Sequence, residues 1–145
     1  MSKRLLNVLI VLNLALIWGN SMLPGEDSGA MSGSVVAWLS EFLPFLAGEW
    51  GHTLIRKAAH FSEFALLGLL WCSRVRLSGA HVGIAQMGLG LAVACIDETI
   101  QIFSPGRASS LLDVWVDTAG FFAGLAIVIG YNMIKSKHNK GAITT

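Results

Sequence analysis

Long apolar runs separated by short polar segments dominate the chain. Four of them approach the roughly 20 residues that a helix needs to cross the hydrocarbon core of a bilayer. They cover residues 5–23, 54–72, 82–103 and about 114–134. The pattern therefore predicts an all-α membrane protein with about four transmembrane helices. The first run follows two basic residues, as in a signal peptide, but its end lacks a small-x-small cleavage pattern, so we expect it to be retained.

The segment 24–53, between the first two runs, also contains apolar residues at helical spacing. Pro44 interrupts this pattern near its end. The spacing predicts a short amphipathic helix on the outer membrane surface. A segment that only packs on the ends of the helices would fit the pattern equally well. The apolar positions are Val35, Val36, Leu39, Phe42, Leu43 and Leu46.

The composition supports a membrane protein. Of the 145 residues, 54% are hydrophobic and only 13% are charged, whereas a soluble domain has about 25% charged residues. The net charge of +1 provides no field that would attract a polyanion, so we expect no nucleic-acid partner. Both cysteines lie in apolar runs, which argues against a disulfide framework. The length predicts a single domain over 1–145.

The positive charges predict the orientation in the membrane. Seven of the ten Lys and Arg residues lie before the first run, after the second or after the fourth. Since such residues favour the cytoplasmic side, we expect both termini in the cytoplasm and the loops 24–53 and 104–113 outside. Residues 135–145 would then form a basic cytoplasmic tail.

Polar and ionisable side chains gather near the outer ends of the last three runs. Their spacing of three, four or seven residues places those of one run on one helix face. An ionisable side chain in lipid costs about 2.5–3.5 kcal/mol, so we expect these side chains to face one another in an outward-open polar pocket. They are Arg56, Lys57, His60, Glu63, Asp97, Glu98, Gln101, Arg107, Asp113 and Asp117.

The residue types in this pocket suggest two kinds of role. A carboxyl group beside His60 suits general acid–base catalysis, so the candidate catalytic residues are His60, Asp97 and Glu98. Basic side chains suit a phosphate or a carboxylate. The candidate ligand-binding residues are Arg56, Lys57, Glu63, Gln101, Arg107, Asp113 and Asp117. The sequence does not decide whether the protein is an enzyme.

Two other interpretations apply to the same residues. His60, Glu63 and Asp97 could hold a metal, but the sequence has no H-E-x-x-H motif and only one histidine reaches the pocket. We therefore expect neither a metal nor a cofactor. Alternatively, the charged pairs only lock the helices together and have no chemical role.

Several of these residues follow one another along the chain in the same order as in VanZ-like proteins, so the sequence resembles this family over about residues 50–130. Two positions depart from the family: Phe64 stands where it often has Tyr, and Asp117 where it commonly has Asn. The matching positions are Lys57-Ala58-Ala59-His60 with Phe64 and Leu67, then Glu98-x-x-Gln101, Phe103-x-Pro105-Gly106-Arg107, Asp113, Gly120 and Gly124.

The resemblance implies a small protein of the bacterial inner membrane, from a family named after a protein linked to teicoplanin resistance. The family's motif positions here are Lys57, His60, Glu98, Gln101, Arg107 and Asp113. Together with the pocket, this predicts binding of, or action on, an anionic envelope lipid, a cell-wall precursor or a lipoglycopeptide, and a role in glycopeptide resistance.

Two other functions fit the same features. One is a non-enzymatic scaffold or binding module in the lipid bilayer. The other is a small proton-coupled carrier, because intramembrane acids and histidine often form proton relays. Four helices are few for a carrier, but the small-x-x-x-small pattern of Gly120 and Gly124 permits a homodimer.

Overall fold

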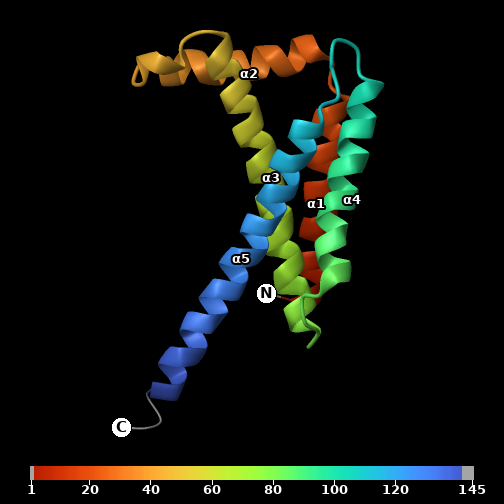
Figure 1. Ribbon diagram of the computed structural model, residues 1–145, viewed down its shortest axis with the longest axis vertical. Coiled ribbons are helices and arrows are strands. Elements are labelled where there is room, and N and C mark those ends of the chain that lie inside the picture. Colours follow the sequence, from red (N-terminus) through yellow and green to blue (C-terminus); the bar gives the residue numbers. More distant parts are fainter. Residues whose placement is uncertain (1, 142–145) are drawn as a thin grey trace.

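The computed structural model describes residues 2–141 of the backbone and the side chains of residues 2–136. The described residues form five α-helices and one short 3-10 helix, without a strand, which confirms the all-α prediction (Figure 1). In chain order they are α1 (Lys3–Met22), α2 (Gly25–Ser40), η1 (Pro44–Leu46), α3 (Glu49–Leu77), α4 (Ile84–Ile102) and α5 (Leu111–Gly141).

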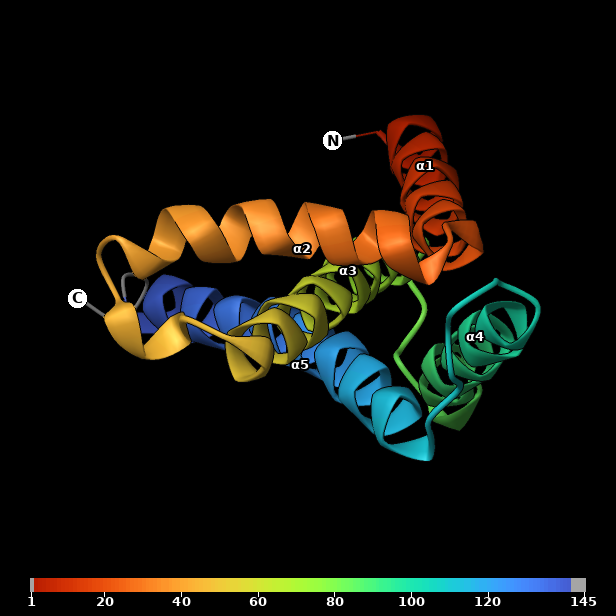
Figure 2. The same cartoon turned by 90° about the horizontal axis from the view of Figure 1, so that it is seen from above.

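Four of the helices form a bundle, and the fifth lies across one end of it. In Figure 1, α1, α3, α4 and α5 run roughly along the long axis, while α2 lies crosswise at the top. Figure 2, which looks down from that end, shows α2 passing over part of α3. The first turn of α1 and the last turn of α5 both lie away from α2 (Figure 1). These two helix ends therefore lie toward the same end of the bundle; the membrane side that this end faces stays a prediction.

Glycines bring α3 and α5 into direct backbone contact. A Cβ atom on Gly120 would collide with the carbonyl oxygen of Phe61, and one on Gly124 with that of Ala65. Gly68 of α3 meets the backbone of Phe121 in the same way. The small-residue stripe predicted on α5 is thus a helix-packing surface. Its partner is α3 of the same chain, so a homodimer, which stays a prediction, would need another surface.

Two helices are long and apolar enough to cross a membrane on length and composition alone. They are Lys3–Met22 and the part Leu111–Ser136 of α5. The predicted second and third spans are helical in α3 and α4, but ionisable residues near one end of each lower their hydropathy. Four transmembrane helices are therefore not established by this criterion.

The segment 24–53 is helical as predicted, but the predicted extent of its helix is wrong. Helix α2 begins at Gly25, directly after Pro24, and ends at Ser40. Acidic Glu26 and Asp27 occupy its first turn, where the helix dipole favours negative charge. The helix stops short of Pro44, which instead begins η1, because proline disfavours helical backbone in the residue before it.

The boundaries of all four predicted runs also shift. The observed helices are Lys3–Met22 against 5–23, Glu49–Leu77 against 54–72, Ile84–Ile102 against 82–103 and Leu111–Gly141 against about 114–134. The predicted tail 135–145 is therefore a helical extension in its first part, and its last residues, 142–145, lie outside the described residues.

Candidate functional site

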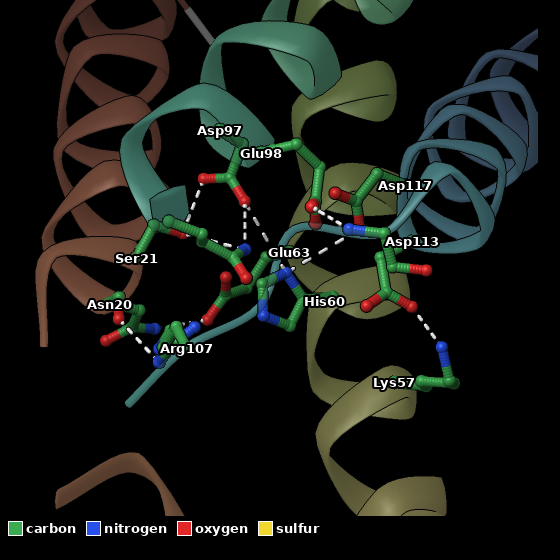
Figure 3. A network of polar contacts seen from close by, with 12 residues as sticks. Asn20, Ser21, Lys57, His60, Glu63, Asp97, Glu98, Arg107, Asp113 and Asp117 are labelled. Atoms are coloured by element: carbon green, nitrogen blue, oxygen red, sulfur yellow. Dashed lines mark hydrogen bonds and ion pairs between the residues drawn. The ribbon is translucent and has the colours of Figure 1, made fainter. Parts of the chain in front are cut away.

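Three side chains from three different helices meet inside the bundle near α2 (Figure 3). His60 of α3 places its Nδ1 atom 3.8 Å from Oδ2 of Asp97 in α4 and 3.6 Å from Oδ1 of Asp117 in α5. Both aspartates are fully buried, and the side chain of His60 is 14% exposed. We call these three residues the central triad.

Asp97 is held in place by two hydrogen bonds. The Ser21 hydroxyl, at the end of α1, donates to its Oδ1 at 2.6 Å. The side-chain amide of Gln101, one turn further along α4, donates to its Oδ2 at 2.9 Å. Both donors are buried. The orientation of the Asp97 carboxylate is therefore fixed from two helices.

Other buried polar atoms at this site have no hydrogen-bond partner among the described residues. Both carboxylate oxygens of Asp117 are of this kind, and so are Nδ1 of His60 and Oε1 of Glu98. Leaving a buried polar group unpaired costs about 1–3 kcal/mol, and more when the group is charged. Such a concentration of unpaired groups in one place points to a role beyond packing.

Glu98 uses its second oxygen to begin α5. Its Oε2 accepts a hydrogen bond of 2.7 Å from the backbone N–H of Ser110, directly before the first residue of that helix. Backbone N–H groups at a helix N-terminus lack partners within the helix. Glu98 therefore connects α4 to the start of α5.

Lys57 and Asp113 form an ion pair between α3 and α5 (Figure 3). Their side chains are 28% and 21% exposed. The ammonium group that the sequence suggested for an anionic ligand is thus already paired with a carboxylate.

Arg107 lies in the loop between α4 and α5 and binds the end of α1. Its guanidinium donates to the carbonyl oxygens of Leu23 at 3.1 Å and Asn20 at 2.9 Å. Burial lowers the pKa of Arg107, and the positive charge of Arg56 adds to this effect, yet arginine keeps its charge near neutral pH. Its hydrogen bonds compensate the free carbonyl groups at the helix end.

The same loop is attached to α1 and α2 by two further hydrogen bonds. The Ser104 hydroxyl donates to the carbonyl oxygen of Ser21 at 2.7 Å, and the N–H of Gly25 donates to that of Pro105 at 2.8 Å. Gly106 has a φ of +71°, which glycine adopts without strain. The loop between α4 and α5 is therefore joined to the end of α1 and to the start of α2.

A cavity of about 180 Å³ lies beside the triad, between the end of α1, helix α2 and the first half of α3. One part of its wall is polar, and Asn20 donates there to Oε1 of Glu63 at 2.6 Å. The lining residues are Asn20, Leu23, Ser28, Met31, Ser32, Val35, Ile55, Arg56, Ala59, His60 and Glu63.

The structure divides the ten sequence-predicted residues into three groups. Arg56, His60 and Glu63 line the cavity. Asp97, Gln101 and Asp117 lie buried behind it, around the triad. The other four serve contacts between elements: Lys57, Glu98, Arg107 and Asp113.

Sequence reasoning missed the serines that support this site. Ser21 orients Asp97, Ser104 binds the end of α1, and Ser110 precedes α5. Only Ser21 has a usable signal, because it follows the buried residues Asn13 and Ile17 at spacings of four. The α2 wall of the cavity was also missed, since the polar pattern indicated only the last three runs.

The family model of VanZ/LLP1 matches residues 6–134. The chain belongs to the VanZ/LLP1 family. The match begins well before the stretch 50–130 on which the resemblance was based, and it includes α1 and α2. No curated protein and no solved structure matches the chain significantly. The VanZ/LLP1 match thus covers both the triad and the whole cavity wall.

Proposed function

We propose that this VanZ/LLP1 protein crosses the bacterial inner membrane with α1, α3, α4 and α5, with both termini in the cytoplasm and α2 on the outer surface. Supporting this, α1 exposes a row of large apolar side chains that includes Val8, Val11 and Leu12, while Asn13 and Ser21 of the same helix are buried. Soluble monomers rarely expose large contiguous apolar patches. Apolar residues outside and polar residues inside suit lipid surroundings.

Within this topology, we propose that the cavity binds the anionic group of an amphiphilic envelope molecule. The observation that carries this proposal is its two-sided wall. Leu23, Val35 and Ile55 form an apolar side, and Arg56 contributes a positive charge. Arg56 forms no ion pair with any described residue. Arginine is well suited to phosphate and carboxylate groups.

The size of the cavity limits what it can hold. Pockets for drug-sized ligands measure roughly 300–1,000 Å³, and this cavity has about 180 Å³. It therefore accommodates a head group and a short part of a chain, while the rest of the ligand lies along exposed Met31 and Val35 or in the bilayer. Anionic lipids, lipid-linked cell-wall precursors and acylated glycopeptides such as teicoplanin share this chemistry.

Binding by purified protein in detergent tests the proposal. The probes are a polyprenyl monophosphate, phosphatidylglycerol and teicoplanin, with zwitterionic phosphatidylcholine as the reference lipid. Arg56→Gln should weaken binding of an anionic probe by about 10–100-fold, the effect of losing a charge-assisted hydrogen bond. Arg76→Gln is the matched control, because Arg76 lies on the same helix, in its last turn. Equal affinities of the two variants would contradict the proposal.

Family membership also leads us to propose a role in glycopeptide resistance. Expression of the chain in a teicoplanin-sensitive bacterium should then raise the inhibitory concentration, and Arg56→Gln should remove the effect while Arg76→Gln keeps it. If the protein binds a lipid phosphate but its expression does not change teicoplanin sensitivity, its function in the cell envelope is one other than glycopeptide resistance.

A further inference from the structure

We propose that the central triad of His60, Asp97 and Asp117 binds a divalent transition-metal ion, with Zn²⁺ or Mn²⁺ as the best candidates. This site lies behind the cavity wall and goes beyond the proposed function, because it requires no lipid or glycopeptide ligand. The sequence led us to expect no metal, because it has no H-E-x-x-H motif and brings only one histidine to the pocket; the ligand set considered there was His60, Glu63 and Asp97. The structure turns Glu63 toward Asn20 and places Asp117 at the triad instead.

The distances within the triad suit a shared ion. One ligand atom from each residue can be chosen so that all three lie within 4.8 Å of one another. Nδ1 of His60 is 3.6 Å from Oδ1 of Asp117 and 3.8 Å from Oδ2 of Asp97. At zinc–ligand bonds of about 2.0–2.2 Å, tetrahedral ligands are about 3.4 Å apart. The two His60 distances therefore need to shorten by only a few tenths of an ångström, and the two carboxylates, whose ligand atoms lie within 4.8 Å of each other, would also move closer around an ion.

The unpaired atoms of the triad favour an ion over simple packing. Asp117 is fully buried, yet both of its oxygens lack a hydrogen-bond donor among the described residues, and Nδ1 of His60 likewise has no partner. These are the atoms that face one another (Figure 3). A metal ion would give Nδ1 of His60 and one oxygen of Asp117 a partner at once and reduce the cost of burying these atoms unpaired.

The charges around the triad point the same way. Two buried aspartates carry two negative charges when ionised, and among the described residues no lysine or arginine forms an ion pair with either of them. Lys57 pairs with Asp113, and Arg107 binds carbonyl groups of α1. A divalent cation would neutralise both carboxylates while His60 stays neutral, as metal binding requires.

Asp97 also has the surroundings of a metal ligand. Ligating carboxylates are usually fixed by hydrogen bonds from neighbouring groups. Ser21 holds Oδ1 of Asp97, and Gln101 donates to Oδ2. Since a carboxylate oxygen has more than one lone-pair direction, Oδ2 can accept from Gln101 and still coordinate an ion.

The donor set restricts the choice of ion. Imidazole nitrogen suits zinc and its neighbours, carboxylate oxygen suits manganese and magnesium, and the triad offers one nitrogen and two carboxylates. Three protein ligands leave a fourth position for water. If the proposed function holds, this position also suits an oxygen of the ligand's anionic group, because His60 lines the cavity as well.

Metal content of the purified full-length protein tests the site. The protein in detergent is stripped with a chelator, dialysed against Zn²⁺ or Mn²⁺ alone, and analysed by mass spectrometry of the elements. We expect about one ion per chain for the wild type. Asp117→Asn, which keeps the side-chain shape, should bind the ion at least about 100-fold more weakly. Asp27→Asn in the exposed first turn of α2 removes the same charge and should bind like the wild type.

A second variant keeps the test decisive if Asp117→Asn fails to fold. Ser21→Ala removes no ligand and no charge, only the hydrogen bonds of its hydroxyl with Asp97 and Gln101, and should weaken binding by about 10–100-fold. Wild-type protein that retains no ion, or wild type, Ser21→Ala and Asp117→Asn with equal affinities, would overturn the site. Neither result depends on Arg56 or on any lipid probe, so failure here is distinct from failure of the proposed function.

Discussion

At the scale of single residues, Glu98 combines a structural contact with a chemically available atom. Its Oε2 accepts from the N–H of Ser110 and so begins α5, while its buried Oε1 has no partner among the described residues. The sequence suggested an acid–base role for Glu98. The structure adds a second reason for a carboxylate here, because negative charge at a helix N-terminus is favourable. Substitutions of Glu98 can separate the acid–base role from the structural contact with Ser110.

Glu98→Gln should leave the fold nearly intact. The amide oxygen can still accept a hydrogen bond from the N–H of Ser110. The free energy of unfolding should therefore fall only by the interaction between the carboxylate charge and the helix dipole, about 0.3–1 kcal/mol. Glu98→Ala removes the acceptor and leaves the N–H unpaired, which costs about 1–3 kcal/mol. Thermal unfolding in detergent measures both. If the two variants unfold at the same temperature, the contact to Ser110 contributes no stability. A Glu98→Gln variant that stays folded but no longer changes teicoplanin sensitivity would support a chemical role for the carboxylate.

At the scale of the elements, the α3–α5 contact positions the site. His60 and Lys57 come from α3, and Asp113 and Asp117 from α5, so the distance between these two helices sets the spacing of their side chains. Gly120 and Gly124 bring the backbones together one to two turns beyond Asp117. Any side chain there would push α5 away and open the triad. The packing stripe and the polar stripe of α5 thus depend on each other.

Alanine at two glycines of α5 should have opposite effects. A Cβ on Gly124 meets the carbonyl oxygen of Ala65, which is backbone and cannot turn aside, so Gly124→Ala should destabilise the protein by about 1–3 kcal/mol. Gly130 has nothing within 4 Å of its added Cβ, and Gly130→Ala should stabilise the helix by about 0.5–1 kcal/mol. Unfolding temperatures of the pair, measured side by side, check the signs. A stabilising Gly124→Ala would show that α3 and α5 pack less closely.

At the scale of the whole molecule, the sequence predicts the helices better than the partners of their polar groups. Apolar runs locate α1, α3, α4 and α5 because length and hydropathy are local properties. Spacing also reveals polar faces that meet. It cannot reveal that Arg107 binds carbonyl groups of α1, or that Ser21 reaches Asp97. Those contacts join residues 76–87 positions apart, and they follow from the packing of the bundle.

The position of α2 follows from the same packing and determines what the cavity can reach. Figure 1 shows α2 at the end opposite to the start of α1 and the end of α5, and one side of α2 lines the cavity. If the positive charges near the termini keep that end in the cytoplasm, α2 and the cavity face outward. Envelope molecules on the outer side could then enter without crossing the membrane. The proposed ligand class thus depends on the orientation of the chain.

Labelling of single cysteines decides this orientation. In a Cys72→Ala/Cys95→Ala background, Ser34→Cys places a thiol on an exposed position of α2 and Ser136→Cys places one near the end of α5. A maleimide that cannot cross membranes should label position 34 in intact spheroplasts and position 136 only after lysis. The reason is that the basic residues next to position 136 favour the cytoplasmic side. The reverse pattern would turn the cavity toward the cytoplasm. External glycopeptides would then be excluded as its ligands, while the metal site, which depends only on contacts inside the bundle, would be unaffected.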